Sequence, residues 1–312
     1  MQPYKLAVLL IGLLSTLKAI TMEKFTGIYA ASLTPLHADL SCDYDAYAVH
    51  CKELIEQGCS GVVLFGTTGE GPSFSVAERQ EGIQALVERG VDPKKIIVSV
   101  GCPSVEDTIT LTQAALAAKC AAVLMTPPYF FKNVSDAGII AFYREVIRKV
   151  NNPDLKIFLY HIPQFSGVRI SLDVIRTLHE EFPTTVIGMK ESEGNFELTS
   201  AVLKQFPNLQ LLVGSEKMIA DAVSLGATGG ISGIANICPQ LICSLYKSKE
   251  RQPEIEALSA VLKNYPFIPA IKSLLAQKKG SSWNMLRPPL VPLSSNESIR
   301  FAEDVQTCEQ TH

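Results

Sequence analysis

The sequence lacks paired cysteine motifs. None of its eight cysteines belongs to a Cys-x-x-Cys pair, and they are spread along the chain. Such spacing is typical neither of a zinc site nor of the disulfide framework of a small secreted domain. We therefore expect a cytoplasmic protein with reduced thiols at Cys42, Cys51, Cys59, Cys102, Cys120, Cys238, Cys243 and Cys308.

The sequence also lacks a basic block and a long apolar run. Lys and Arg number 28 against 31 Asp and Glu, which gives no reason to expect a nucleic-acid or membrane-surface partner. The apolar run at residues 6–14 is too short to span a bilayer. It resembles a signal peptide, but no clean cleavage site follows it, and Met22 opens a second natural start. We expect residues 1–21 to be an N-terminal extension outside the fold.

Short apolar runs alternate with helix-like segments from Gly27 onward. The runs are nearly continuous rather than alternating, which is typical of parallel strands covered on both faces. Eight such units fit a closed barrel of about 250 residues. The expected strands are residues 28–33, 61–65, 96–100, 121–125, 156–160, 185–189, 210–213 and 229–232.

Helix signals separate these strands. Ser75 and Glu78 form a capping box for a helix that is expected to run to Gly90, and Ser104 and Ser135 are plausible N-caps. After Pro239 the pattern is helical only. The fold class is therefore α/β: a (β/α)₈ TIM barrel over residues 22–238 with a C-terminal helical appendage over residues 239–312.

Active sites of such barrels lie at the C-terminal ends of the strands. Lys190 follows the apolar run at residues 186–189, so its stem should emerge from the barrel core. Loss of hydration there favours the neutral amine, which attacks carbonyl groups to form imines. The alternative is a structural lysine paired with Glu191 or Glu193.

Two further features stand at strand ends. Tyr160 ends the strand before that of Lys190, so its phenol could carry the protons of imine formation; the alternative is a rim tyrosine with a hydrated hydroxyl. Residues 66–70 read GTTGE, with two glycines that expose backbone N–H groups and two hydroxyls that suit a small carboxylate. The alternative is a polar loop that binds nothing.

Together these segments resemble the N-acetylneuraminate lyase and dihydrodipicolinate synthase superfamily of class I pyruvate-dependent aldolases. The resemblance covers about residues 24–295. It rests on the order of Thr34-Pro35, GTTGE at 66–70, Thr126-Pro-Pro-Tyr129, Tyr160-His-Ile-Pro163, Gly167, Gly188-Met-Lys-Glu191, Gly214, Gly229-Gly-Ile-Ser232 and Arg287-Pro-Pro-Leu-Val-Pro-Leu293.

The resemblance implies roles for four catalytic residues. Lys190 would form the Schiff base with pyruvate, and Tyr160 would donate and accept protons. Thr67 and Tyr129 would complete the proton relay, with Tyr129 reaching in from a neighbouring subunit. That placement implies a homo-oligomer, a dimer or a homotetramer.

The resemblance also implies substrate contacts. Thr68 would hold the pyruvate carboxylate, and the carbonyl of Ile231 would face the oxo acid. Phe165 fills a position where the synthase branch usually has an arginine, and a phenyl ring cannot bind a carboxylate in bidentate fashion. Glu216, after Gly214, stands where sialic-acid lyases carry an acidic pair. Neither branch fits fully.

The sequence therefore predicts a lyase, an aldolase for a 2-oxo-4-hydroxy acid or a 2-keto-3-deoxy sugar acid. Its partners are pyruvate and a small aldehyde or oxo acid. One alternative is 4-hydroxy-tetrahydrodipicolinate synthase, which condenses pyruvate with aspartate semialdehyde; another is a catalytically silent barrel that binds oxo acids. No cofactor is expected, and no metal, because the five histidines show no ligand spacing.

Overall fold

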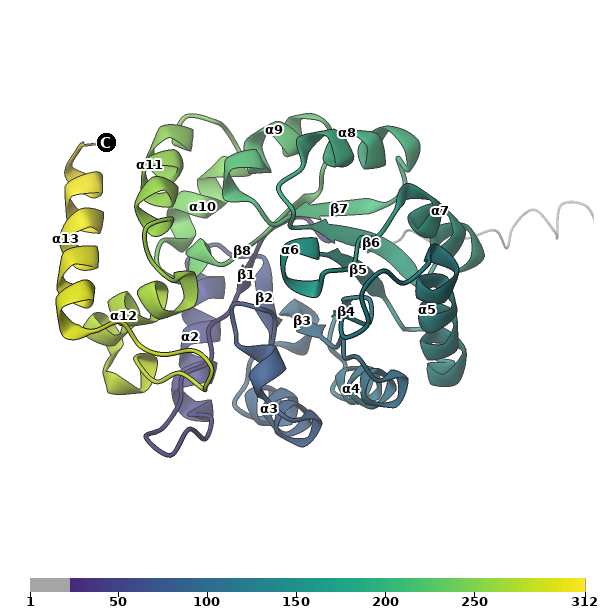
Figure 1. Ribbon diagram of the computed structural model, residues 1–312, viewed down its shortest axis with the longest axis horizontal. Coiled ribbons are helices and arrows are strands. Elements are labelled where there is room, and N and C mark those ends of the chain that lie inside the picture. The colour runs from purple at the N-terminus through teal and green to yellow at the C-terminus, as the bar shows by residue number, and fades with distance from the viewer. Residues whose placement is uncertain (1–22, 312) are drawn as a thin grey trace, which may run out of the picture.

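The computed structural model describes residues 23–311 and contains a closed barrel of eight parallel strands in chain order (Figure 1). The predicted (β/α)₈ barrel is confirmed. The strands are β1 (Gly27–Ala31), β2 (Gly61–Leu64), β3 (Ile96–Ser99), β4 (Ala122–Met125), β5 (Ile157–His161), β6 (Val186–Glu191), β7 (Gln210–Val213) and β8 (Gly229–Ser232).

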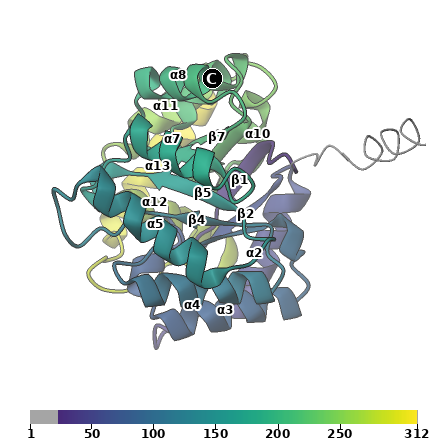
Figure 2. The same cartoon turned by 90° about the vertical axis from the view of Figure 1, so that its right-hand side faces the viewer.

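Helices surround the barrel and follow its strands in turn (Figures 1 and 2). They are α2 (Tyr44–Glu56), α3 (Val76–Glu88), α4 (Val105–Ala117), α5 (Asp136–Val150), the short α6 (Pro163–Ser166), α7 (Leu172–Glu181), α8 (Phe196–Gln205), α9 (Ile219–Ser224) and α10 (Pro239–Leu245). Three more complete the chain: α11 (Gln252–Leu262), α12 (Phe267–Lys279) and α13 (Ser295–Thr311).

The predicted helix starts agree with the structure. Ser75 and Glu78 form the reciprocal capping box of α3, and the side chains of Ser104 and Ser135 accept N-capping hydrogen bonds in α4 and α5. Helix α3 ends at Glu88, slightly before the expected Gly90. These caps fix where each helix begins, and therefore how long each strand-to-helix loop can be.

Strand β6 is longer than predicted. The expected strand ended at residue 189, whereas β6 continues through Lys190 and Glu191. The two added residues stay in the ladder, because Lys190 is in register with Tyr160 on β5 and with Leu212 on β7. Lys190 is thus held by a strand on each side, and Tyr160 is its direct neighbour across β5 and β6.

The C-terminal helices lie against one side of the barrel. Helix α10 contacts β1, next to the place where β8 and β1 pair. Helices α11, α12 and α13 pack together beyond it (Figure 1). The division of the chain at residue 238 stays a prediction, and the predicted extension at residues 1–21 lies outside the described residues.

The fold bears on the expectations about cysteines and membrane-spanning helices. The eight cysteines all lie within the described residues and form no disulfide there. None of the helices described is long and apolar enough to cross a membrane.

Candidate active site

Three side chains at the C-terminal end of the barrel form a chain of polar contacts. Lys190 and Tyr160 are 6% and 3% exposed. The Lys190 Nζ donates to the Tyr160 hydroxyl at 3.3 Å, and that hydroxyl lies 3.4 Å from Thr67 Oγ1. The Lys190 Nζ also lies 4.5 Å from the centre of the Tyr160 ring. This geometry places an amine nucleophile beside a hydroxyl relay that can move its protons.

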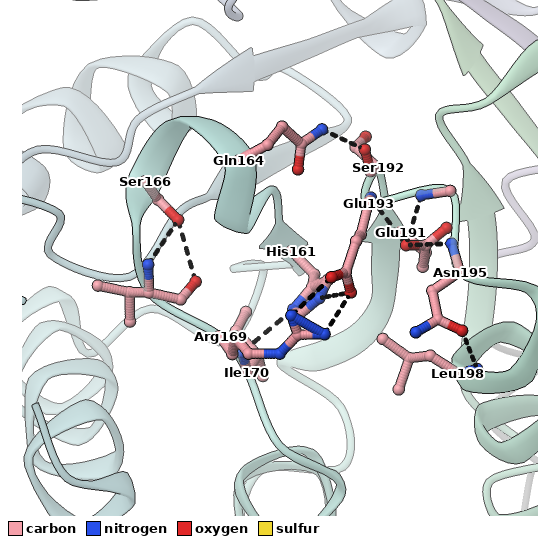
Figure 3. A network of polar contacts seen from close by, with 12 residues as sticks. His161, Gln164, Ser166, Arg169, Ile170, Glu191, Ser192, Glu193, Asn195 and Leu198 are labelled. Carbon is pink, nitrogen blue, oxygen red and sulfur yellow. Dashed lines mark hydrogen bonds and ion pairs between the residues drawn. The ribbon is translucent and has the colours of Figure 1, made fainter. Parts of the chain in front are cut away.

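The alternative pairing of Lys190 with Glu191 or Glu193 is not formed. Arg169 binds both carboxylate oxygens of Glu193, at 2.6 and 2.7 Å. One oxygen of Glu191 accepts backbone N–H bonds from residues 193, 194 and 195, at 2.8, 3.0 and 3.4 Å (Figure 3). Within residues 23–311, no carboxylate lies within ion-pair distance of Lys190.

His161, Glu191 and Glu193 have ligand atoms within 4.8 Å of one another, as a metal site would require. The His161 ring, however, is already committed: its Nδ1 accepts from the Ile170 N–H at 3.1 Å, so its protonated Nε2 donates to Glu193 at 3.1 Å (Figure 3). Burial lowers the pKa of His161 and raises that of Glu191. The contacts describe a network that holds the turn after β6.

A cavity of about 300 Å³, which we call the lysine cavity, opens over Lys190. Every predicted site residue except Tyr129 lines it: Thr67, Thr68, Tyr160, Phe165, Lys190, Gly214, Glu216 and Ile231. Phe165 on α6 is 68% exposed, so its ring stands at the rim. The structure therefore brings together residues from six parts of the barrel that the sequence keeps apart.

Close packing shapes one wall of this cavity, where Gly214 and Ser192 both line it. A Cβ on Gly214 would lie 2.1 Å from the Ser192 hydroxyl oxygen. On the β8 side, the Glu216 carboxylate accepts from the Ser232 hydroxyl at 2.7 Å. Glu216 is thus tied to the end of β8 while it lines the cavity.

A buried ion pair joins the GTTGE loop to α12. Glu70 and Lys272 on α12 are in contact at 2.5 Å, and both side chains are fully buried. Lys272 also donates to the Met285 carbonyl at 2.7 Å, and Glu70 accepts the Arg287 N–H at 3.0 Å. Sequence analysis missed Lys272, although its place within the apolar stretch of α12 was an available signal.

A second cavity, of about 220 Å³, adjoins the first. We call it the arginine cavity, because Arg79 on α3 lines it together with Tyr129. The two cavities share Thr67, Tyr160, Ile162 and Phe165. Tyr129 therefore lies next to the predicted relay within its own chain, and burial raises its pKa. Its predicted reach into a neighbouring subunit stays a prediction.

Sequence analysis missed Arg79 entirely. Arg79 shares the buried face of α3 with Ile83 and Leu86, at a helical spacing that was visible in the sequence. The C-terminal contributors Phe267 and Leu290, which line the lysine cavity, carried no such signal because they reach it only through tertiary packing.

Comparison with known proteins places this geometry in a family. A DapA-like lyase of Chloroflexus aurantiacus, itself uncharacterized, is 33% identical over 88% of this chain and 94% of that protein. The crystal structure of dihydrodipicolinate synthase from Agrobacterium tumefaciens is 34% identical, with a TM-score of 0.87 over 91% of this chain and 99% of that one. A Sulfolobus solfataricus 2-keto-3-deoxygluconate aldolase variant shares the fold at 21% identity, with a TM-score of 0.82 over 91% of this chain and 97% of that one.

The sequence model of the Dihydrodipicolinate synthetase family matches residues 24–308, nearly the whole of the described chain. This match agrees with the barrel and with the resemblance seen in the motifs. The chain belongs to the dihydrodipicolinate synthetase family and is a lyase of that family.

Proposed function

We propose that Lys190 binds pyruvate as an imine and that the protein is a class I aldolase. Its reaction joins pyruvate to an aldehyde, or cleaves the product, a 2-oxo-4-hydroxy acid or a 2-keto-3-deoxy sugar acid. One observation carries the proposal: the buried Lys190 amine contacts the Tyr160 hydroxyl, which in turn contacts Thr67.

The covalent steps follow from this contact. The Lys190 nitrogen attacks C2 of pyruvate, and Tyr160 delivers the proton with which the C2 hydroxyl leaves as water. Loss of a C3 proton from the imine gives the enamine. The enamine C3 then bonds to the aldehyde carbon, whose oxygen takes up a proton. Hydrolysis of the new imine frees Lys190 and releases the 2-oxo-4-hydroxy acid.

The GTTGE loop suits the pyruvate carboxylate. Thr67 and Thr68 both line the lysine cavity, as does Ile231 on β8. Their hydroxyls and the turn's backbone N–H groups are the donors that a small carboxylate requires. In this proposal Thr68 holds the carboxylate and Thr67 connects Tyr160 to Tyr129.

The choice of an aldolase over a synthase rests on Phe165. An apolar ring that is 68% exposed stands at the mouth of the lysine cavity, where it offers no charge to a carboxylate. The second candidate is 4-hydroxy-tetrahydrodipicolinate synthase, which the similarity to the Agrobacterium dihydrodipicolinate synthase favours.

We further propose a cytoplasmic homotetramer. Phe130 and Phe131, which follow Tyr129 in the loop between β4 and α5, are each 72% exposed. Paired exposed aromatic side chains are enriched at interfaces between subunits. A partner over this loop would also cover the arginine cavity from the side of Tyr129.

Borohydride trapping tests the proposed chemistry. Reduction in the presence of pyruvate is expected to leave a three-carbon adduct on the peptide that contains Lys190, detected by mass spectrometry. Lys190→Ala should abolish the adduct, whereas Lys149→Ala, at an exposed surface pair, should retain it. An adduct on another lysine, or none in the wild type, would refute the mechanism.

A further inference from the structure

The guanidinium of Arg79 is buried without an anionic partner. The whole Arg79 residue is 4% exposed. Its Nη1 donates to the Cys102 sulfur at 3.4 Å and its Nη2 to the Ser99 carbonyl, while its Nε has no hydrogen-bond partner. Within residues 23–311, no carboxylate lies within 4.0 Å of this guanidinium. Arg79 is therefore a buried cation held only by neutral groups.

This arrangement is costly, because a buried charge loses hydration that neutral acceptors only partly replace. Burial accordingly lowers the pKa of Arg79. The neighbouring Arg287 shows the usual solution: its guanidinium binds both oxygens of Glu78, at 2.5 and 3.0 Å. Glu78 precedes Arg79 in α3, but side chains at adjacent helix positions point in different directions, and the Glu78 carboxylate pairs with Arg287.

Residues that carry hydroxyl groups also contribute to the lining of the arginine cavity, whose surface is otherwise mostly apolar. They are Thr67, Ser99, Thr126, Tyr129, Tyr160 and Ser166. A guanidinium with free donor capacity binds carboxylates and phosphates with directional, charge-assisted hydrogen bonds, and hydroxyls can add further donors.

The cavity also lies where a substrate could reach it. Thr67 and Tyr160 line both the arginine cavity and the lysine cavity, so the two meet at the proposed proton relay. A ligand joined to Lys190 at one end can extend past Tyr160 toward Arg79. The volume of about 220 Å³ is enough for a short chain that ends in an acid group.

We propose that the arginine cavity is an anion subsite that receives the carboxylate or phosphate of the aldehyde substrate. The preferred second substrate is then an aldehyde with an acid group at the end away from its carbonyl, a class that includes the aspartate semialdehyde of the second candidate function. This inference rests on the proposed function, because it requires the aldehyde to meet the Lys190 enamine beside Tyr160.

The test compares pairs of aldehydes that have the same number of carbon atoms but differ in charge. With pyruvate and wild-type protein, kcat/KM is measured for succinic semialdehyde against butanal, and for glyceraldehyde 3-phosphate against glyceraldehyde. Hydrogen bonds to charged groups contribute about 1.5–3 kcal/mol, so the anionic member of at least one pair is expected to be favoured by roughly 10- to 150-fold. Arg79→Met should reduce that ratio toward one, and Arg79→Lys should keep part of it.

Lys132 provides the matched control. It is the nearby rival cation, with its ammonium bound to the carbonyls of Tyr129 and Ser166. Lys132→Met should keep the preference for the anionic aldehyde. Loss of the preference in Lys132→Met but not in Arg79→Met would overturn the proposal.

The wild-type comparison stands even if the Arg79 variants do not fold. Equal kcat/KM for both members of each pair would overturn the subsite. Activation of butanal turnover by inorganic phosphate, without any preference for the anionic aldehydes, would also overturn the subsite. The cavity would then bind a free anion and not the acid group of the substrate. A failed borohydride trap in the wild type refutes the imine chemistry instead, so the two failures are distinguishable.

Discussion

Replacing Lys272 with methionine should be among the most damaging single changes near the site. Lys272 and Glu70 are both fully buried and lie 2.5 Å apart. Removing one member of a buried pair leaves an uncompensated charge and typically costs about 3–5 kcal/mol. The Met285 carbonyl also loses a donor that now lies 2.7 Å away. We therefore expect Lys272→Met to lower the free energy of unfolding by an amount in this range.

Urea unfolding followed by circular dichroism measures the loss. The double variant Lys272→Met/Glu70→Gln should recover much of the lost unfolding free energy. Glu70→Gln removes the carboxylate charge that Lys272→Met leaves unpaired. Lys149→Met is the surface control: its pair with Glu106 is largely exposed, so the substitution should leave the free energy of unfolding nearly unchanged. A loss for Lys272→Met no greater than for this control would refute the reasoning.

Two further predictions concern catalysis and pH. Tyr160→Phe should lower kcat by about 10²–10⁴-fold with little change in pyruvate binding, measured by steady-state kinetics and by titration with pyruvate; an unchanged kcat would remove Tyr160 from the relay. Burial, together with Lys279, lowers the pKa of His50 from 6.5 to about 3, so the folded state keeps this ring neutral while the unfolded state takes up a proton. The stability from neutral His50 is complete above pH 6.5 and is lost as the pH falls toward 3. Between pH 6.5 and 4.5 the wild type should lose about 2 kcal/mol more unfolding free energy than His50→Gln, and parallel curves for the two proteins would contradict the assignment.

The sequence was informative where a local pattern decides the structure. Continuous apolar runs located all eight strands, and Ser75, Ser104 and Ser135 marked helix starts because capping depends on neighbours within one turn. The predicted end of β6 was wrong. Lys190 is charged and therefore looked like a residue beyond the strand, whereas ladder pairing with β5 and β7 keeps it within the sheet.

Contacts between distant segments could not be predicted in this way. Glu70 and Lys272 are separated by 202 positions, and only the packing of α12 against the GTTGE loop joins them. Arg79 was recognisable as a residue on the buried face of α3, but the lack of a described carboxylate within 4.0 Å of its guanidinium depends on which distant segments pack around that helix. Which charges are paired is thus a tertiary property, and it determines which of them remain available to a substrate.

The positions of Phe165 and Arg79 bear together on how the second substrate is selected. A guanidinium at position 165 would stand at a rim where the native ring is 68% exposed, so water and salt would weaken its hold on a carboxylate. Arg79 is 4% exposed, and a charge-assisted hydrogen bond there is stronger because few waters compete. Anion recognition at Arg79 would therefore discriminate more sharply than recognition at the rim. It would also favour aldehydes long enough to pass Tyr160, which gives chain length, as well as charge, a role in the choice of substrate.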